Sequence, residues 1–177
     1  DKEMHENQER LDEEMGNVSM RYDAMLDKAM ILTMAGFFLE AEQVFEKLDT
    51  SAFDAAQKVS WYNVRQKFLH DYNEYVRTSS FAVPDVGKIA FYQDKVLEGT
   101  PEDSNLNRHM RILRMIERRE FERAYDENMA FIESLSPEEH DYAVQTYWQG
   151  FICENLERPD EVIHWWVESA ICDIRGA

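Results

Sequence analysis

The segment GFFLEAEQVF, residues 36–45, gives the clearest indication of the fold. It opens with a glycine, and the small residue Ala41 stands three residues after the aromatic Phe38 and four before the aromatic Phe45. Glycine commonly follows the last turn of a helix. The three- and four-residue steps after it are those of an amphipathic helix. The segment therefore predicts that one helix ends at Gly36 and that a second helix packs against it.

The same spacing recurs at two later places. In EFERA, residues 120–124, an aromatic residue again stands three residues before a small one, Ala124. In RPDEV, residues 158–162, Val162 takes the small position, and an aromatic residue, Trp166, again follows it by four residues. The three small positions are 83 and 38 residues apart. The longer interval leaves room for one enlarged unit, which lacks the motif.

This repeated spacing resembles the tetratricopeptide repeat, a unit of about 34 residues with two helices and small residues where they touch. The resemblance implies an all-α fold, a tetratricopeptide-like right-handed superhelix of about four antiparallel helix pairs. The chain has only 6 glycines and 4 prolines, which argues against a many-stranded sandwich or barrel. The expected helix pairs span about residues 19–49, 54–98, 103–135 and 138–174.

Local signals predict several boundaries. Ser79, Ser80 and Pro84 should end a long helix, because the residue before a proline avoids the α region. Ser136, followed by a proline and then by a glutamate three residues on, predicts the N-cap of a later helix. Residues 1–15 carry seven acidic residues, so we expect a charged N-terminal tail or a frayed helix there. Residues 16–177 are expected to form a single helical-repeat domain.

The chain is strongly acidic. Its 36 Asp and Glu residues against 19 Lys and Arg residues give a formal net charge of −17. This charge repels nucleic-acid backbones and anionic membranes, so we expect no nucleic acid to bind this segment. No run of about 18 apolar residues is present, so no membrane span is expected within it. Cys153 and Cys172 are expected to be unbridged and mostly buried, because roughly 16 Å separates them along the proposed helix pair.

No motif in the sequence predicts catalysis. None of the five histidines has another histidine or a cysteine at the spacing of a zinc site, and HExxH and CxxC are absent. The calcium loop of an EF-hand and the glycine-rich phosphate loops are also absent. We therefore expect no catalytic, cofactor-binding or metal-binding residues, and the protein is not expected to be an enzyme.

The register of the repeat predicts a partner-binding groove. Grooves of this kind usually bind extended peptides or partner helices. The groove residues predicted from the first helices of the pairs are Met30, Met34, His109, Leu113, Tyr147, Phe151 and Glu154. The alternative is that the aromatic residues only fill the space between neighbouring helix pairs.

A basic stretch interrupts the acidic background. Arg111, Arg114 and Arg118 follow one another at helical steps and fall roughly on one helix face. Such a face is a candidate anion patch, because guanidinium groups form strong charge-assisted hydrogen bonds. The alternative is a solvated face on which these arginines pair with neighbouring glutamates.

Longer segments carry a second resemblance. They are DKAMILTMAGFFLEA (residues 27–41), FYQDKVL (91–97), PEEHDYA (137–143) and SAICDIR (169–175). Over about residues 20–175, the chain resembles the helical-repeat portion of a large Bacteroidota family of membrane-anchored regulators. Members of that family look like proteins with an export signal, a tetratricopeptide-like sensor region, a transmembrane helix and a cytoplasmic output segment that binds DNA.

The resemblance implies a non-catalytic binding or sensor module of a signalling or transcription-regulating protein. Its partner would be a protein, a peptide or a small ligand. The module would be a periplasmic piece of a longer chain, with membrane contact only through the parent protein's transmembrane helix. The alternative is a free-standing cytoplasmic tetratricopeptide adaptor, and a homodimer also stays open. The resemblance supplies no catalytic or ligand residues.

Overall fold

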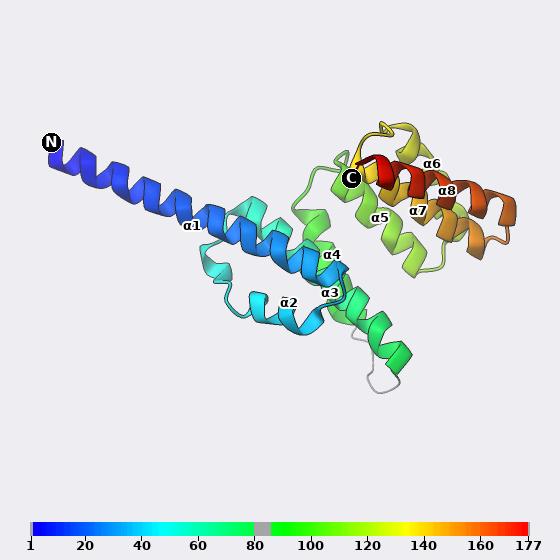
Figure 1. Cartoon of the computed structure of the whole chain (residues 1–177), viewed down its shortest axis with the longest axis horizontal. Coiled ribbons are helices and arrows are strands. Elements are labelled where there is room, and N and C mark those ends of the chain that lie inside the picture. The colour runs from blue at the N-terminus through cyan, green and yellow to red at the C-terminus, as the bar shows by residue number, and fades with distance from the viewer. Residues whose placement is uncertain (1, 80–85, 177) are drawn as a thin grey trace. The chain divides into compact units, whose positions relative to one another are not determined.

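The structure is a computed structural model that describes residues 2–79 and 86–176 (Figure 1). Within these ranges the regular structure consists of eight α-helices and one 3₁₀ helix, with no strand, which confirms the all-α prediction. The elements are α1 (Lys2–Met34), α2 (Phe38–Phe45), η1 (Thr50–Ala52), α3 (Ala55–Ser79), α4 (Val86–Glu98), α5 (Asn105–Glu117), α6 (Phe121–Glu133), α7 (His140–Asn155) and α8 (Pro159–Gly176).

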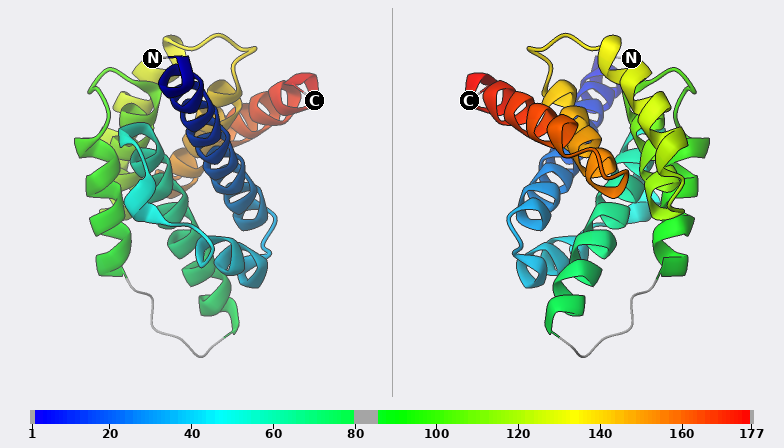
Figure 2. Two further views of the ribbon diagram at one scale, coloured as in Figure 1. Left: turned by 90° about the vertical axis from the view of Figure 1, so that its left-hand side faces the viewer. Right: turned by 90° about the vertical axis from the view of Figure 1, so that its right-hand side faces the viewer.

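The helices form two compact units, Asp1–Gly99 and Thr100–Ala177. In the first unit α1 packs against α2 and α3, and α3 packs against α4. In the second unit α5 packs against α6, α6 against α7, and α7 against α8 (Figure 2). Consecutive helices thus pair within each unit, as in tetratricopeptide repeats. A single domain over residues 16–177 stays a prediction.

Three of the turns between paired helices have the same backbone geometry. Gly36, Arg119 and Glu157 all adopt positive φ angles, of 80°, 61° and 57°. After each of them, the next backbone N–H donates to a carbonyl five residues back, at 2.9 to 3.0 Å. This is the Schellman arrangement, which satisfies the last carbonyl groups of a helix. The three positions are 83 and 38 residues apart, as the small residues predicted.

The small residues lie where paired helices touch. Ala41 and Ala124 have no exposed surface. Gly150 serves the same purpose on α7, because a Cβ atom there would clash with the ring of Trp166 on α8. The indole Nε1 of Trp166 also donates to the backbone carbonyl of Tyr147, at 3.2 Å. Only glycine lets this ring lie against the α7 backbone.

The second helix pair departs from this pattern. Its first helix, α3, has 25 residues and ends at Ser79, the first residue of the predicted break. The other two residues of that break, Ser80 and Pro84, lie outside the described residues. At its start, Asp54 and Gln57 form a reciprocal cap. The Gln57 N–H donates to Asp54 Oδ1 at 2.7 Å, and the Asp54 N–H donates to Gln57 Oε1 at 3.1 Å. The start of α3 is therefore defined by this cap, in a helix pair whose sequence lacks the repeat motif.

The N-cap predicted at Ser136 is wrong. Helix α7 begins at His140, and its N-cap residue is Glu139. The Ser136 N–H instead donates to the side chain of Glu139, and the Glu139 N–H donates to the Ser136 carbonyl. These bonds close a separate turn ahead of the helix, so the expected pair of capping residues acts one turn too early to start α7.

Candidate functional site

The outward face of α7 carries apolar and aromatic residues. Helix α7 packs against α5, α6 and α8, and the stripe Val144, Tyr147 and Phe151 follows one face of it. Phe151 also packs against the core of the second unit. Tyr147 is 51% exposed, and Val144 and Phe151 are half-buried. The Trp148 ring lies 5.6 Å from both Tyr147 and Phe151, in edge-to-face contacts. A solvent-facing helix stripe is ordinarily polar, so this one is a candidate contact surface.

Helix α5, which adjoins α7, carries two more of the predicted groove residues. His109 and Leu113 are half-buried, and α5 packs against α7. The His109 ring contacts the side-chain amide of Gln145 on α7. Five of the predicted groove residues therefore lie on two adjoining helices of the second unit: His109, Leu113, Tyr147, Phe151 and Glu154.

Buried amides hold α7 in place behind this surface. The side chains of Asn128, Gln145 and Gln149 are almost fully buried. Asn128 Nδ2 donates to the Gln145 carbonyl at 3.0 Å and to Gln149 Oε1 at 2.8 Å. Directional bonds between buried amides are lost if one helix slides along another. They therefore fix the register of α6 against α7 and the position of the exposed stripe.

The remaining two groove residues lie in the first unit. Met30 is half-buried and packs against the core that contains Leu26 and Ala29, whereas Met34 is exposed at the end of α1. A groove that includes all seven predicted residues stays a prediction.

The arginine stretch is engaged within the second unit. Arg111 donates through Nε to Asn107 Oδ1 at 3.0 Å and through a terminal nitrogen to the Glu102 carbonyl at 2.8 Å. It lines a surface depression of about 480 Å³ together with Arg108, Glu102 and Asp103. The lining of this depression therefore contains as many acidic as basic residues.

The other two arginines of the candidate anion patch lie further along the chain. Arg114 is half-buried in the last turn of α5, and Arg118 is exposed at its C-cap. An anion site over Arg111, Arg114 and Arg118 stays a prediction.

Cys153, Cys172 and Tyr142 pack within the second unit. Cys153 and Cys172 are buried and not joined in a disulfide, as predicted. Burial, with Glu161 nearby, raises the pKa of the Cys153 thiol to about 11, so little nucleophilic thiolate is present at neutral pH. Burial and a hydrogen bond to Glu168 raise the pKa of Tyr142 to about 12. In the part of the chain that the structure describes, no group of three or more His, Cys, Asp or Glu residues could hold a metal ion.

A second candidate surface lies in the first unit and was missed by the sequence analysis. A cavity of about 500 Å³ opens between α1 and the start of α3, lined in part by Met15, Val18, Tyr22 and Gln57. The sequence does indicate this surface, because Met15, Val18 and Tyr22 follow one another at three- and four-residue steps. This spacing continues the apolar spacing of α1 toward the N-terminus. The many acidic residues around Met15 concealed this spacing.

The comparisons with known proteins agree with the fold. None of the helices in the described part of the chain is both long and apolar enough to cross a membrane. Searches of curated proteins and of solved structures give no match. The family model described as the SusR N-terminal TPR domain matches residues 4–177. The chain therefore belongs to the SusR N-terminal TPR domain family.

Proposed function

We propose that this chain is the non-catalytic binding and sensor module of a signalling or transcription-regulating protein, and that it takes its partner on the α5 and α7 face of the second unit. Domains of the tetratricopeptide type are in general non-catalytic helical-repeat modules that mediate protein–protein interaction. The observation that carries the proposal is the aromatic stripe of α7, with Tyr147 half exposed above a rigid amide core.

The chemistry of this face favours a peptide or protein partner with apolar side chains. Exposed tyrosine, with phenylalanine and tryptophan beside it, offers large contact area at low entropic cost, as in many protein-binding surfaces. Glu154, exposed one turn beyond Phe151 on α7, and His109 on the adjoining α5 would provide polar contacts to such a partner. The alternative occupant of this surface is a small ligand that stacks on the rings.

We further propose that the module works in the periplasm, as part of a membrane-anchored chain whose transmembrane helix lies elsewhere in the parent protein. A free-standing cytoplasmic adaptor is the alternative. The native gene separates the two. An encoded export signal upstream and a transmembrane segment downstream would support the anchored module, and a gene that encodes neither would contradict it.

Site-specific crosslinking in the native host tests the binding face. A photo-crosslinking phenylalanine analogue replaces Tyr147 in the full-length protein, and in a second strain it replaces Tyr75, an exposed tyrosine of the first unit. We expect a discrete adduct with a partner at position 147 and none of the same mass at position 75. Adducts of equal yield at both positions, or at neither, would contradict the proposed face.

A direct binding measurement then tests how much Tyr147 contributes to the affinity for the partner. Once the partner is identified, Tyr147→Ala should weaken its binding by about tenfold or more, because truncation of a central interface tyrosine commonly costs above 1 kcal/mol. The change should leave the fold intact, because half of this side chain is already exposed. Tyr75→Ala, the matched control, should leave the affinity unchanged.

A further inference from the structure

The apolar face of α1 extends beyond the helices that cover it. Leu26 and Ala29 lie in the core of the first unit, and Tyr22 packs against it. Continuing toward the N-terminus along the same face, in steps of four and three residues, leads to Val18 and Met15. These two side chains are 47% and 70% exposed. The core-facing stripe of α1 therefore continues where none of the described helices of the unit covers it.

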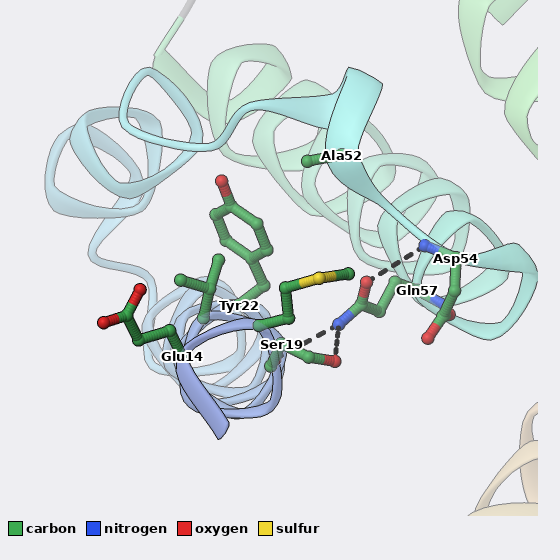
Figure 3. A pocket seen from close by; sticks show the side chains of 8 residues that line it. Glu14, Ser19, Tyr22, Ala52, Asp54 and Gln57 are labelled. Carbon is green, nitrogen blue, oxygen red and sulfur yellow. Dashed lines mark hydrogen bonds between the residues drawn. The ribbon is translucent and has the colours of Figure 1, made fainter. Parts of the chain in front are cut away.

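A cavity lies beside this uncovered stripe. Its volume is about 500 Å³, and it lies between α1, η1 and the start of α3 (Figure 3). Met15, Val18, Tyr22 and Ala52 form its apolar lining. Side chains of a helix laid along α1 could enter such a groove, as in other helix-in-groove complexes.

The buried polar group of the cavity is already satisfied within the protein. Gln57 Nε2 donates to the carbonyl and the hydroxyl of Ser19, at 3.1 and 3.0 Å, and to Asp23 Oδ1 at 3.2 Å. Gln57 Oε1 accepts the Asp54 N–H (Figure 3). Small-molecule sites rely on a few polar groups that orient the ligand. Here the best placed amide is occupied at both ends, so the cavity suits apolar side chains better than a polar ligand.

The charge around the stripe points to the kind of partner. Residues 1–18 contain seven acidic and two basic residues. Glu14 lines the cavity, and Asp12 and Glu13 are exposed on the adjoining turns of α1. A second copy of α1 would bring the same negative charge to the contact, which opposes self-association. A partner with lysine or arginine beside its apolar residues would be attracted instead.

We propose that the α1 stripe and its cavity form a docking site for a basic amphipathic helix of a partner protein. Apolar side chains at i, i+3 or i+4, and i+7 of that helix would contact Met15 and Val18 and enter the cavity. Its lysine or arginine residues would lie beside Glu13 and Glu14. This site belongs to the first unit and is separate from the α7 stripe.

The test uses a synthetic peptide and the intact chain. A fluorescein-labelled peptide of about five helical turns carries leucine at helical a and d positions and lysine elsewhere, and a matched peptide carries glutamate in place of lysine. Binding is followed by fluorescence anisotropy at low and at physiological salt. We expect the lysine peptide to bind, more weakly as salt rises, and the glutamate peptide not to bind.

Two variants of α1 locate the contact. Met15→Glu places a charge on the proposed stripe, and Met20→Glu places the same charge on another face of the helix, where the side chain is 71% exposed. Because both variants add one negative charge, general attraction of the lysine peptide changes equally. We expect Met15→Glu to weaken its binding by at least about tenfold, which is 1.4 kcal/mol, and Met20→Glu to leave it within about twofold.

Other outcomes would overturn the proposal. Equal effects of Met15→Glu and Met20→Glu would mean that the peptide binds by charge alone. A dimer in sedimentation velocity that Met15→Glu dissociates would assign the stripe to a second copy of the chain. Far-UV circular dichroism melts of both variants confirm that the helices remain folded. Tyr147→Ala should leave peptide binding unchanged, so this test and the test of the α7 face can fail separately.

Discussion

The contacts around Phe45 in the first unit differ in kind from those between α6 and α7 in the second. In the first unit, Phe45 meets Trp61 and Phe68 edge-to-face at 5.4 and 5.3 Å, and the Arg65 guanidinium lies 4.5 Å from the Phe45 ring centre. In the second unit, buried amides cross from α6 to α7, with Asn128 at their centre. Around Phe45 the contacts are made by rings and a cation, whereas between α6 and α7 hydrogen-bonded amides join the apolar side chains. Each unit also holds a contact of the other kind, since Gln93 donates to Gln66 between α4 and α3 and Arg108 lies 4.5 Å from the Phe131 ring centre.

These two kinds of contact differ in how precisely they fix the position of one helix along another. Ring contacts provide large buried areas, and the hydrophobic part of their attraction is non-directional, so they tolerate small shifts better than hydrogen bonds do. Hydrogen bonds between side-chain amides are lost when a donor moves by about an ångström away from its acceptor. The contact of α6 with α7, which lies behind the candidate binding face, therefore fixes its helix register more strictly than the ring contacts around Phe45 do, and it keeps the rings of α7 in one arrangement.

Phe45→Ala should have the largest effect, and it should be confined to the first unit. The ring is 5% exposed and contacts Trp61, Arg65 and Phe68, so its removal leaves a large cavity. We expect a loss of about 3–5 kcal/mol in the free energy of unfolding of that unit. Amide hydrogen exchange read by mass spectrometry should show lower protection in α1 to α3.

The second unit provides the control for this substitution. Protection in α6 to α8 should stay within about 0.5 kcal/mol of the wild-type value if the two units unfold separately. Equal loss of protection in both units would show that they unfold as one cooperative body, and the comparison of two independent cores would not hold.

Asn128→Ala should have the next largest effect, in the second unit. It removes both donors of a fully buried amide and leaves Gln149 Oε1 and the Gln145 carbonyl without those bonds. Buried acceptors that lose a partner cost about 1–3 kcal/mol each. We expect roughly 2–4 kcal/mol of destabilisation in urea unfolding.

A second readout separates loss of register from loss of stability. In Asn128→Ala at low denaturant, the near-UV circular dichroism of Tyr147 and Trp148 should weaken if α7 shifts against α6. The control is Glu127→Ala, which introduces the same residue at the preceding, exposed position of α6 and should leave the near-UV spectrum unchanged. An unchanged near-UV spectrum in Asn128→Ala would contradict the role of the amides in fixing the register.

The helix pairs could be predicted from the sequence because their signals are local. A glycine with small and aromatic residues at fixed steps marked the turn at Gly36, and the same steps led to the turns after α5 and α7. The turn after α5 has Arg119 at the left-handed position, so residue type alone would have missed it. The repeat spacing supplied the information that the residue itself lacked.

The candidate surfaces were harder to predict because they depend on tertiary contacts. Asn128, Gln145 and Gln149 look like surface residues in the sequence, and only the packing of α6 on α7 buries them. Met15 and Val18 lie in or beside a charged segment that was expected to be a tail or a frayed helix, whereas α1 begins at Lys2. The apolar spacing of a helix does not show which part of that helix its neighbours cover.

The repeated turn offers the smallest predicted effect and the most direct comparison of the units. Gly36 and Glu157 occupy the same backbone position, with φ angles of 80° and 57°. A non-glycine residue there carries a conformational cost of about 1 kcal/mol, and a glutamate also places negative charge at the negative end of the α7 dipole. Glu157→Gly should therefore raise the stability of the second unit by about 0.5–1 kcal/mol.

Gly36→Ala is the reciprocal change in the first unit. A Cβ atom at Gly36 would meet no other atom within 4 Å, so any loss of stability comes from the backbone conformation alone. We expect a loss of about 1 kcal/mol. Thermal melts and hydrogen exchange of the two variants should show opposite signs in the two units. If both variants are neutral, the Schellman turns are not a source of stability, and the shared geometry only reflects how the helices are packed.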